Sequence, residues 1–264
     1  MELKIINSKL INEYLLKVPK GLQQAFTALE DAEISTPNFS FYTSVASVFS
    51  SKIEGESIEL DSYIKHKREG ISFQTDYTQK IDDLYDTYMF AKNNKLTENN
   101  VKEAHKLLSK HIVAKAWQGK YRKQNMYVTT DDGRIEYVAA MPEIVEEEMA
   151  KFFEDIVVLL KKSLTIEEVF YYAFIIHLVF AKIHPWNDGN GRSARLIEKW
   201  FLAEKLGVKA WFIQSEKMYY QQHQTYYHNI RALGSKYEEL NYEKALQFLL
   251  MLPNCLPVGA EYFF

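Results

Sequence analysis

The sequence predicts an all-α protein, and three observations support this prediction. The 264 residues include only 10 Gly and 6 Pro, which is typical of chains with long helices and short connections. Apolar residues recur at three- and four-residue spacing along most of the chain, the pattern of amphipathic helices. No internal repeat or low-complexity linker divides the sequence, so we expect one domain over residues 1–264.

Composition excludes several classes of protein. With 47% hydrophobic and 25% charged residues, the chain can bury a sizeable core. Its net charge of −3 includes no strongly basic block, so we expect no nucleic-acid partner. A single cysteine, Cys255, excludes an internal disulfide framework and a cysteine-based zinc site. The first residues lack a signal-peptide pattern and the most apolar window, 169–183, is too short for a membrane span; we therefore expect a cytoplasmic protein without a membrane partner.

The first expected helix runs from about Ser40 to Ile53, and Gly55 is a good signal for its C-terminal end. A second helix begins near Ser57 or Asp61. Two further amphipathic helices are expected, over residues 75–93 and 97–112.

Residues 125–138 break the helical pattern. Two short segments rich in β-formers flank Asp131-Asp132-Gly133, a turn sequence that favours positive φ. We therefore expect a β-hairpin here.

Helix returns after Pro142. Thr165 and Glu168 have the spacing of a capping box, which opens a buried helix that ends near Ile183. Another helix is expected from about Arg192 to Leu206, with Gly207 just beyond it. The loop between these last two helices contains the residues of greatest chemical interest.

This loop has the features of an anion site. Gly189 and Gly191 flank Asn190 directly before a helix, so backbone N–H groups can approach an anion while the helix N-terminus contributes partial positive charge. Arg192 and Arg195 are one helical turn apart and can clamp phosphate oxygens.

The same loop offers a base and a metal ligand. Because imidazole titrates near neutrality, His184 is a candidate base for deprotonating a hydroxyl, while Asp188 supplies a hard oxygen for Mg²⁺. Each residue alone has an ordinary structural explanation, such as a turn, a helix cap or a surface arginine. Their coincidence within residues 184–195 favours phosphoryl-group chemistry.

The segment 184–195 resembles the signature of the Fic domain family, His-x-Phe-x-(Asp/Glu)-Gly-Asn-Gly-Arg-x-x-Arg, and departs from it only at Trp186. This resemblance extends over most of the chain and implies an all-α Fic fold, a helical bundle with a short β-hairpin flap. It divides the chain into an N-terminal region, a Fic core and a C-terminal helical extension, over residues 1–70, 71–215 and 216–264 respectively.

The resemblance implies transfer of AMP from ATP to a Ser, Thr or Tyr hydroxyl of a target protein or of the chain itself. His184 would deprotonate the hydroxyl and Asp188 would hold Mg²⁺. The remaining residues implied in nucleotide binding are Gly189, Asn190, Gly191, Arg192, Ser193, Arg195 and Tyr227, with Arg192 on the β-phosphate, Arg195 on the γ-phosphate and Tyr227 near the adenine. The flap at about 125–138 would dock the target by strand addition.

Ser50 to Gly55 matches the family's inhibitory pattern, (Ser/Thr)-x-x-x-Glu-(Gly/Asn), within an inhibitory helix over about residues 40–54. A carboxylate at the C-terminal end of a helix opposes the macrodipole, so Glu54 gains by pairing with a cation such as Arg195. Ser50 and Glu54 are therefore expected to inhibit the chain's own activity.

Several alternatives stay open. In some relatives this glutamate helps water to remove AMP, so Glu54 could also support a hydrolase. The fold can transfer another nucleotide or a phosphate group, or it could serve as a nucleotide-regulated binding module without catalysis. A homodimer is possible.

Overall fold

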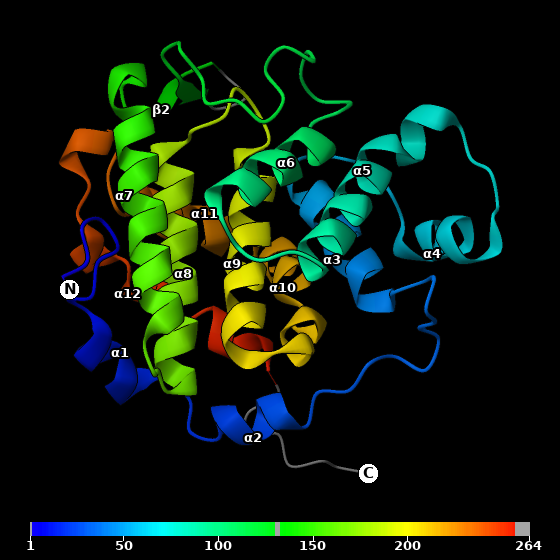
Figure 1. Cartoon of the computed structure of the whole chain (residues 1–264), viewed down its shortest axis with the longest axis horizontal. Helices are drawn as coiled ribbons and strands as arrows, with labels where there is room; N and C mark the ends of the chain where they lie inside the picture. Colours follow the sequence, from blue (N-terminus) through cyan, green and yellow to red (C-terminus); the bar gives the residue numbers. More distant parts are fainter. Residues whose placement is uncertain (1, 130–132, 257–264) are drawn as a thin grey trace.

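The structure is a computed structural model that describes residues 2–129 and 133–256. It is largely helical, with a small two-stranded sheet, and this confirms the predicted fold class (Figure 1). Two helices that pack side by side form its centre, α8 (Ile166–Ile183) and α9 (Asn190–Leu206). Helix α8 is buried on all sides, which explains its almost unbroken apolar sequence.

The other elements surround this pair. Helix α7 (Pro142–Lys161) packs on α8, and α6 (Glu98–Leu108) and α5 (Thr75–Lys92) pack on α9. The N-terminal helices α1 (Ile11–Lys17) and α2 (Leu22–Thr27) contact α8, and neither is among the helices expected from the sequence. After α9 come η1 (Val208–Phe212), α10 (Ser215–Gln221), α11 (His223–Arg231) and α12 (Leu246–Leu249).

Helix α3 (Phe41–Ile53) begins and ends close to the predicted positions. Ser40 is its N-cap, accepting a hydrogen bond from the backbone N–H of Thr43 at 3.3 Å, and Gly55 follows its C-terminal end with φ +89°. The helix packs against α5 on one side and α10 on the other. Its position is therefore set mainly by these two helices.

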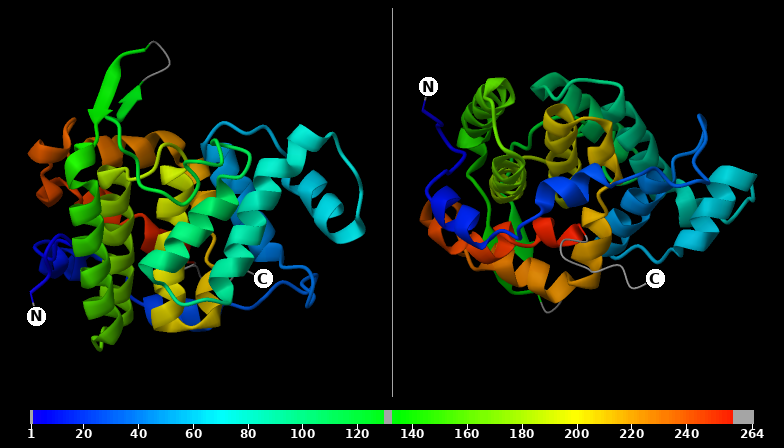
Figure 2. Two further views of the ribbon diagram at one scale, coloured as in Figure 1. Left: turned by 45° about the horizontal axis from the view of Figure 1, so that its top comes forward. Right: turned by 90° about the horizontal axis from the view of Figure 1, so that it is seen from below.

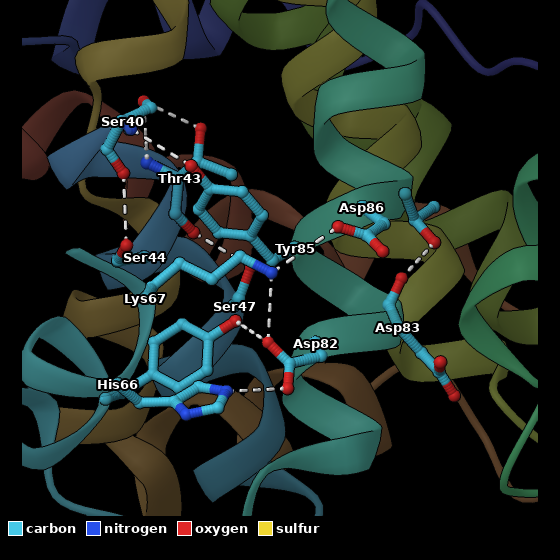
Figure 3. A network of polar contacts seen from close by, with 12 residues as sticks. Ser40, Thr43, Ser44, Ser47, His66, Lys67, Asp82, Asp83, Tyr85 and Asp86 are labelled. Atoms are coloured by element: carbon cyan, nitrogen blue, oxygen red, sulfur yellow. Dashed lines mark hydrogen bonds and ion pairs between the residues drawn. The ribbon is translucent and has the colours of Figure 1, made fainter. Parts of the chain in front are cut away.

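A polar network joins α4 (Leu60–Glu69) to α5 beside α3 (Figure 3). Lys67 Nζ donates to Asp82 Oδ1 at 3.0 Å, and His66 Nε2 lies 3.1 Å from Asp82 Oδ2. The hydroxyl of Tyr85, on α5, accepts the backbone N–H of Ser40 at 3.0 Å. These contacts tie the start of α3 and helix α4 to α5.

The expected hairpin is present as strands β1 (Tyr127–Thr129) and β2 (Ile135–Val138), paired antiparallel. It projects from the helical body at the N-terminal end of α7 (Figure 2, left). The predicted turn lies largely outside the described residues, although Gly133 has the expected positive φ. Val138 N–H donates to the carbonyl of Ser235 at 2.9 Å, which fixes the base of the hairpin to the C-terminal segment.

The capping box that opens α8 is confirmed, since the Thr165 and Glu168 side chains accept each other's backbone N–H at 3.3 and 2.8 Å. Helix α9 begins at Asn190, two residues earlier than expected, and α6 ends at Leu108, before a series of turns. No helix among residues 2–129 and 133–256 is long and apolar enough to cross a membrane.

Candidate active site

The loop between α8 and α9 starts from an unusual backbone conformation. His184 closes the last turn of α8, its N–H donating to Phe180 O at 3.0 Å, and then adopts φ 55°, ψ 58°. It is the one non-glycine residue with positive φ in the described part of the chain. Such a conformation costs on the order of 1 kcal/mol and persists only when neighbouring contacts hold it.

Arg122 supplies those contacts. Its Nε donates to His184 O at 2.7 Å, and its backbone N–H donates to Pro185 O at 2.9 Å. Its Nη2 donates to the carbonyls of Ala140 and Ile183. A single guanidinium, only 2% exposed, thus joins the end of α8 to the segment that leads from the hairpin into α7.

The middle of the loop is fixed by Asn190 and Trp186. The Asn190 amide accepts the Trp186 N–H at 2.8 Å and donates to the Trp186 carbonyl at 3.0 Å. The fully buried Trp186 ring stacks on His105 and Tyr121, with centroids 4.2 and 4.9 Å away. The Asn190 side chain is therefore used to hold the loop in shape, and an anion would be bound by the backbone N–H groups of residues 189–191.

His105 holds the loop next to Asp188. The N–H of Gly119 donates to His105 Nδ1 at 2.9 Å, so the imidazole proton is on Nε2, which donates to the Asp188 carbonyl at 3.0 Å. Burial lowers the pKa of His105 to about 4, so the ring is neutral at pH 7. The Asp188 side chain is exposed at the surface of the loop.

The His184 ring is set up as a base. Its Nδ1 lies 3.2 Å from the carbonyl of Ala181, which can only accept, so Nδ1 carries the proton and Nε2 has the free lone pair. Burial, together with the nearby charge of Arg122, lowers the pKa of His184 to about 4. The imidazole is therefore neutral at physiological pH.

Arg195, one turn into α9, is fully buried and contacts the C-terminal end of α3. Its Nε donates to Ser50 Oγ at 2.8 Å, and its Nη2 donates to Ser50 O at 3.0 Å and to Glu54 Oε1 at 2.6 Å. Glu54 is the C-cap residue of α3, and its side chain is 24% exposed. The two residues of the predicted inhibitory pattern therefore both contact the arginine expected to bind phosphate.

The charge state of this pair follows from its surroundings. Burial alone would raise the pKa of the Glu54 carboxyl, but the charges of Arg195 and Arg192 outweigh burial and lower that pKa below its usual value. Glu54 is therefore ionised at neutral pH and is held as the partner of Arg195.

A buried polar chain continues from Arg195 into the core. Arg195 Nη1 lies 3.5 Å from the hydroxyl of Tyr226, which lies 2.9 Å from His177 Nε2. His177 Nδ1 lies 2.6 Å from Glu198 Oε2, which also accepts from the Tyr219 hydroxyl at 2.7 Å. Sequence reasoning missed His177 and Glu198, because their spacing on α8 and α9 is also that of ordinary core residues.

Two cavities meet at Glu54. The first, of about 190 Å³, is lined by His184, Asn190, Gly191, Arg195, Tyr227 and hairpin residues such as Val128. The second, of about 250 Å³, is lined by charged groups that include Asp188 and Arg192. Glu54 is a wall residue of both cavities, so its carboxylate separates the space beside the candidate base from the space beside the candidate metal ligand.

The structure brings the residues predicted from sequence together, with one exception. His184, Asp188, Asn190, Gly191, Arg192, Arg195, Tyr227 and Glu54 line one or both cavities. Gly189 is the N-cap of α9 with φ 80°, and Ser50 bonds to Arg195. Ser193 is buried, is not a wall residue of either cavity, and its Oγ finds no hydrogen-bond partner among the described residues.

Comparisons with known proteins are consistent with this geometry. Residues 95–202 match the sequence profile of the Fic/DOC family. A Fic family protein from Desulfovibrio desulfuricans G20 superposes with a TM-score of 0.73 at 17% identity, covering 94% of this chain and 73% of that one.

Two further solved structures share the fold. A Fic domain containing signaling protein from Bacteroides thetaiotaomicron has a TM-score of 0.67 at 18% identity and covers 89% of this chain and 91% of its own. Fic-1 from C. elegans has a TM-score of 0.63 at 17% identity, and the match covers 93% of this chain and 68% of that one. No curated protein sequence matches the chain.

Proposed function

We propose that the protein is an adenylyltransferase that moves AMP from ATP to a hydroxyl of a target protein and of itself, because residues 95–202 match the sequence profile of the Fic/DOC family. The observation that carries this proposal is the convergence, on one helix N-terminus, of a neutral histidine, a glycine-rich loop and two buried arginines. These are the components of phosphoryl-group transfer, in which positioning and charge stabilisation supply most of the catalysis.

In the proposed reaction His184 Nε2 accepts the proton of the target hydroxyl. The hydroxyl oxygen then bonds to the α-phosphorus as the bond to the β-phosphate oxygen breaks, and pyrophosphate leaves. The N–H groups of residues 189–191 and the guanidinium groups of Arg192 and Arg195 would hold the negative charge of the phosphates. Tyr227 and hairpin residues such as Val128 also line the cavity beside His184, so the adenine and the target hydroxyl would enter from that side.

Asp188 fits the proposed Mg²⁺ site. Its exposed carboxylate lines the polar cavity beside Arg192. In the described part of the chain, no group of three or more Asp, Glu, His or Cys side chains lies close enough together to hold a metal ion without the nucleotide. Mg²⁺ commonly binds through one or two carboxylates together with substrate phosphates, and one carboxylate is what this loop offers. When bound, the ion would neutralise phosphate charge.

We also propose that Glu54 inhibits this activity. A γ-phosphate bound to Arg195 needs the space and the charge that the Glu54 carboxylate takes in this structure. Ser50 supports the arrangement by accepting from the same guanidinium.

The test is AMP transfer from α-labelled ATP to the protein itself and to proteins of a native lysate. Glu54→Gly should increase labelling strongly, whereas Glu33→Gly, in an exposed turn, should not. His184→Ala in the Glu54→Gly protein should abolish the labelling. Persistent labelling in that double variant would refute the proposed role of His184.

The same assay separates the alternative chemistries. Label from the γ-phosphate of ATP would indicate phosphate transfer, and stronger labelling by another nucleoside triphosphate would change the nucleotide assignment. Release of AMP from a labelled target by the wild-type protein, and not by Glu54→Gly, would assign Glu54 to AMP removal.

A further inference from the structure

A second carboxylate follows Glu54 along the chain. The positive φ of Gly55 turns the backbone, and the N–H of Glu56 bonds back to Ser51 O at 3.1 Å. Glu56 Oε1 then accepts a hydrogen bond from Lys80 Nζ on α5 at 2.6 Å and lies 3.6 Å from Arg192 Nη2. One carboxylate oxygen is thus shared by two cations from different helices.

These cations face the second cavity, the one beside Asp188. Arg192 is only 4% exposed, and within the described residues its Nε has no hydrogen-bond partner. A buried guanidinium with an unsatisfied donor, next to a lysine and a polar cavity, is suited to an anion that offers several oxygens. A single carboxylate oxygen at 3.6 Å from Arg192 meets this requirement only in part.

We propose that Lys80 adds a second cation to the phosphate site already proposed for Arg192, that the two together bind the diphosphate part of the nucleotide, released as pyrophosphate, and that Glu56 occupies this subsite in the present structure. Glu54 and Glu56 would then replace two phosphoryl groups at once, one on Arg195 and the other on Arg192 and Lys80. The identity of the anion rests on the proposed function, whereas the presence of the anion site rests on the geometry.

An ordinary surface ion pair is the competing explanation for Lys80 and Glu56. Their side chains are 38% and 22% exposed, and pairs of that kind contribute little to stability. The two explanations differ in one consequence: a surface pair has no effect on anion binding, whereas a subsite loses affinity without Lys80 and gains affinity when Glu56 is neutralised.

The experiment is calorimetric titration of inorganic pyrophosphate, in buffer containing MgCl₂, into the Glu54→Gly protein. Lys80→Gln in this background should weaken binding roughly five- to tenfold, and Lys80→Arg should restore most of the loss. Glu56→Gln should tighten binding roughly fivefold, because the competing charge is removed. Lys151→Gln is the matched control, since Lys151 is a similarly exposed, ion-paired lysine on α7.

If Lys80→Gln binds pyrophosphate as tightly as Lys151→Gln, or if the Glu54→Gly protein does not bind it at all, the subsite is refuted. Thermal unfolding of each variant shows whether it is folded. This experiment measures binding without turnover. If Lys80→Gln weakened pyrophosphate binding in a protein that never transfers AMP, the subsite would be supported and only the proposed function would be refuted.

Discussion

Glu54 and Gly191 lie so close that a β-carbon added at residue 191 would stand 2.4 Å from Glu54 Oε1. Gly191 is in the first turn of α9 and its φ is not positive, so the backbone itself would accept alanine. The absence of a side chain at residue 191 therefore allows another group to come close to the backbone, and in this structure that group is the Glu54 carboxylate.

Gly191→Ala should consequently have different effects on stability in two backgrounds. In the wild-type protein the new methyl group displaces Glu54 from Arg195 and should lower the free energy of unfolding by about 1 kcal/mol or more. In the Glu54→Gly protein the contact with Glu54 is gone, but the new methyl group still stands 3.2 Å from Arg195 Nη1, which must shift slightly. The higher helix propensity of alanine, worth about 1 kcal/mol relative to glycine, should offset this smaller cost and make the change nearly neutral. Denaturant unfolding of the four proteins measures the coupling; additive effects would contradict the contact.

The pH dependence of AMP transfer follows from the pKa of His184, which burial lowers to about 4. A lowered pKa means that the base is already neutral above about pH 5, so labelling by Glu54→Gly should be nearly constant from pH 6 to 8 and should fall as the pH approaches 4. Removing Glu54 does not raise this pKa, because the Glu54 charge favours the imidazolium. Initial rates at constant ionic strength test this, and a midpoint near pH 6.5 would contradict it.

Tyr226→Phe should weaken nucleotide binding without removing a catalytic group. Its hydroxyl links Arg195 to His177, so its loss leaves the guanidinium less well oriented. In the Glu54→Gly background we expect the KM for ATP to rise about fivefold while kcat changes by less than about twofold. Tyr219→Phe, which removes a hydroxyl from Glu198 without touching Arg195, is the control and should leave KM nearly unchanged.

Trp186→Phe should be tolerated much better than Trp186→Ala. The indole is fully buried, but within the described chain its Nε1 has no hydrogen-bond partner, and loss of this unsatisfied donor should offset part of the lost packing. We expect phenylalanine to cost about 1 kcal/mol or less and alanine about 3–5 kcal/mol, measured by chemical denaturation. A large loss with phenylalanine would show that the stack on His105 and Tyr121 requires the indole.

The helices and the loop could be predicted because their signals are local. Thr165 and Glu168 are three residues apart, and the components of the anion loop are consecutive. The contact of Glu54 with Arg195 joins residues 141 positions apart, and it was expected only because a family pattern pointed to it.

Other parts of the site had no local signal. Arg122 stabilises the backbone at His184 from 62 residues away, and nothing in the sequence around Arg122 indicates that task. Lys80 and Glu56 meet only because α3 and α5 pack side by side. The helices at residues 11–17 and 22–27 are short, and their apolar positions were too few to show a helical period.

The packing of α3 between α5 and α10 has a consequence for how the proposed inhibition could be relieved. An inhibitor that is part of the same folded domain cannot be removed by dilution, and its effective concentration at Arg195 stays in the millimolar range or above whatever the amount of protein. Relief would then depend on a ligand that competes for the site or on a binding partner that shifts the end of α3. A rise in nucleotide concentration alone would relieve the inhibition only if the nucleotide bound Arg195 more tightly than the tethered Glu54 carboxylate does.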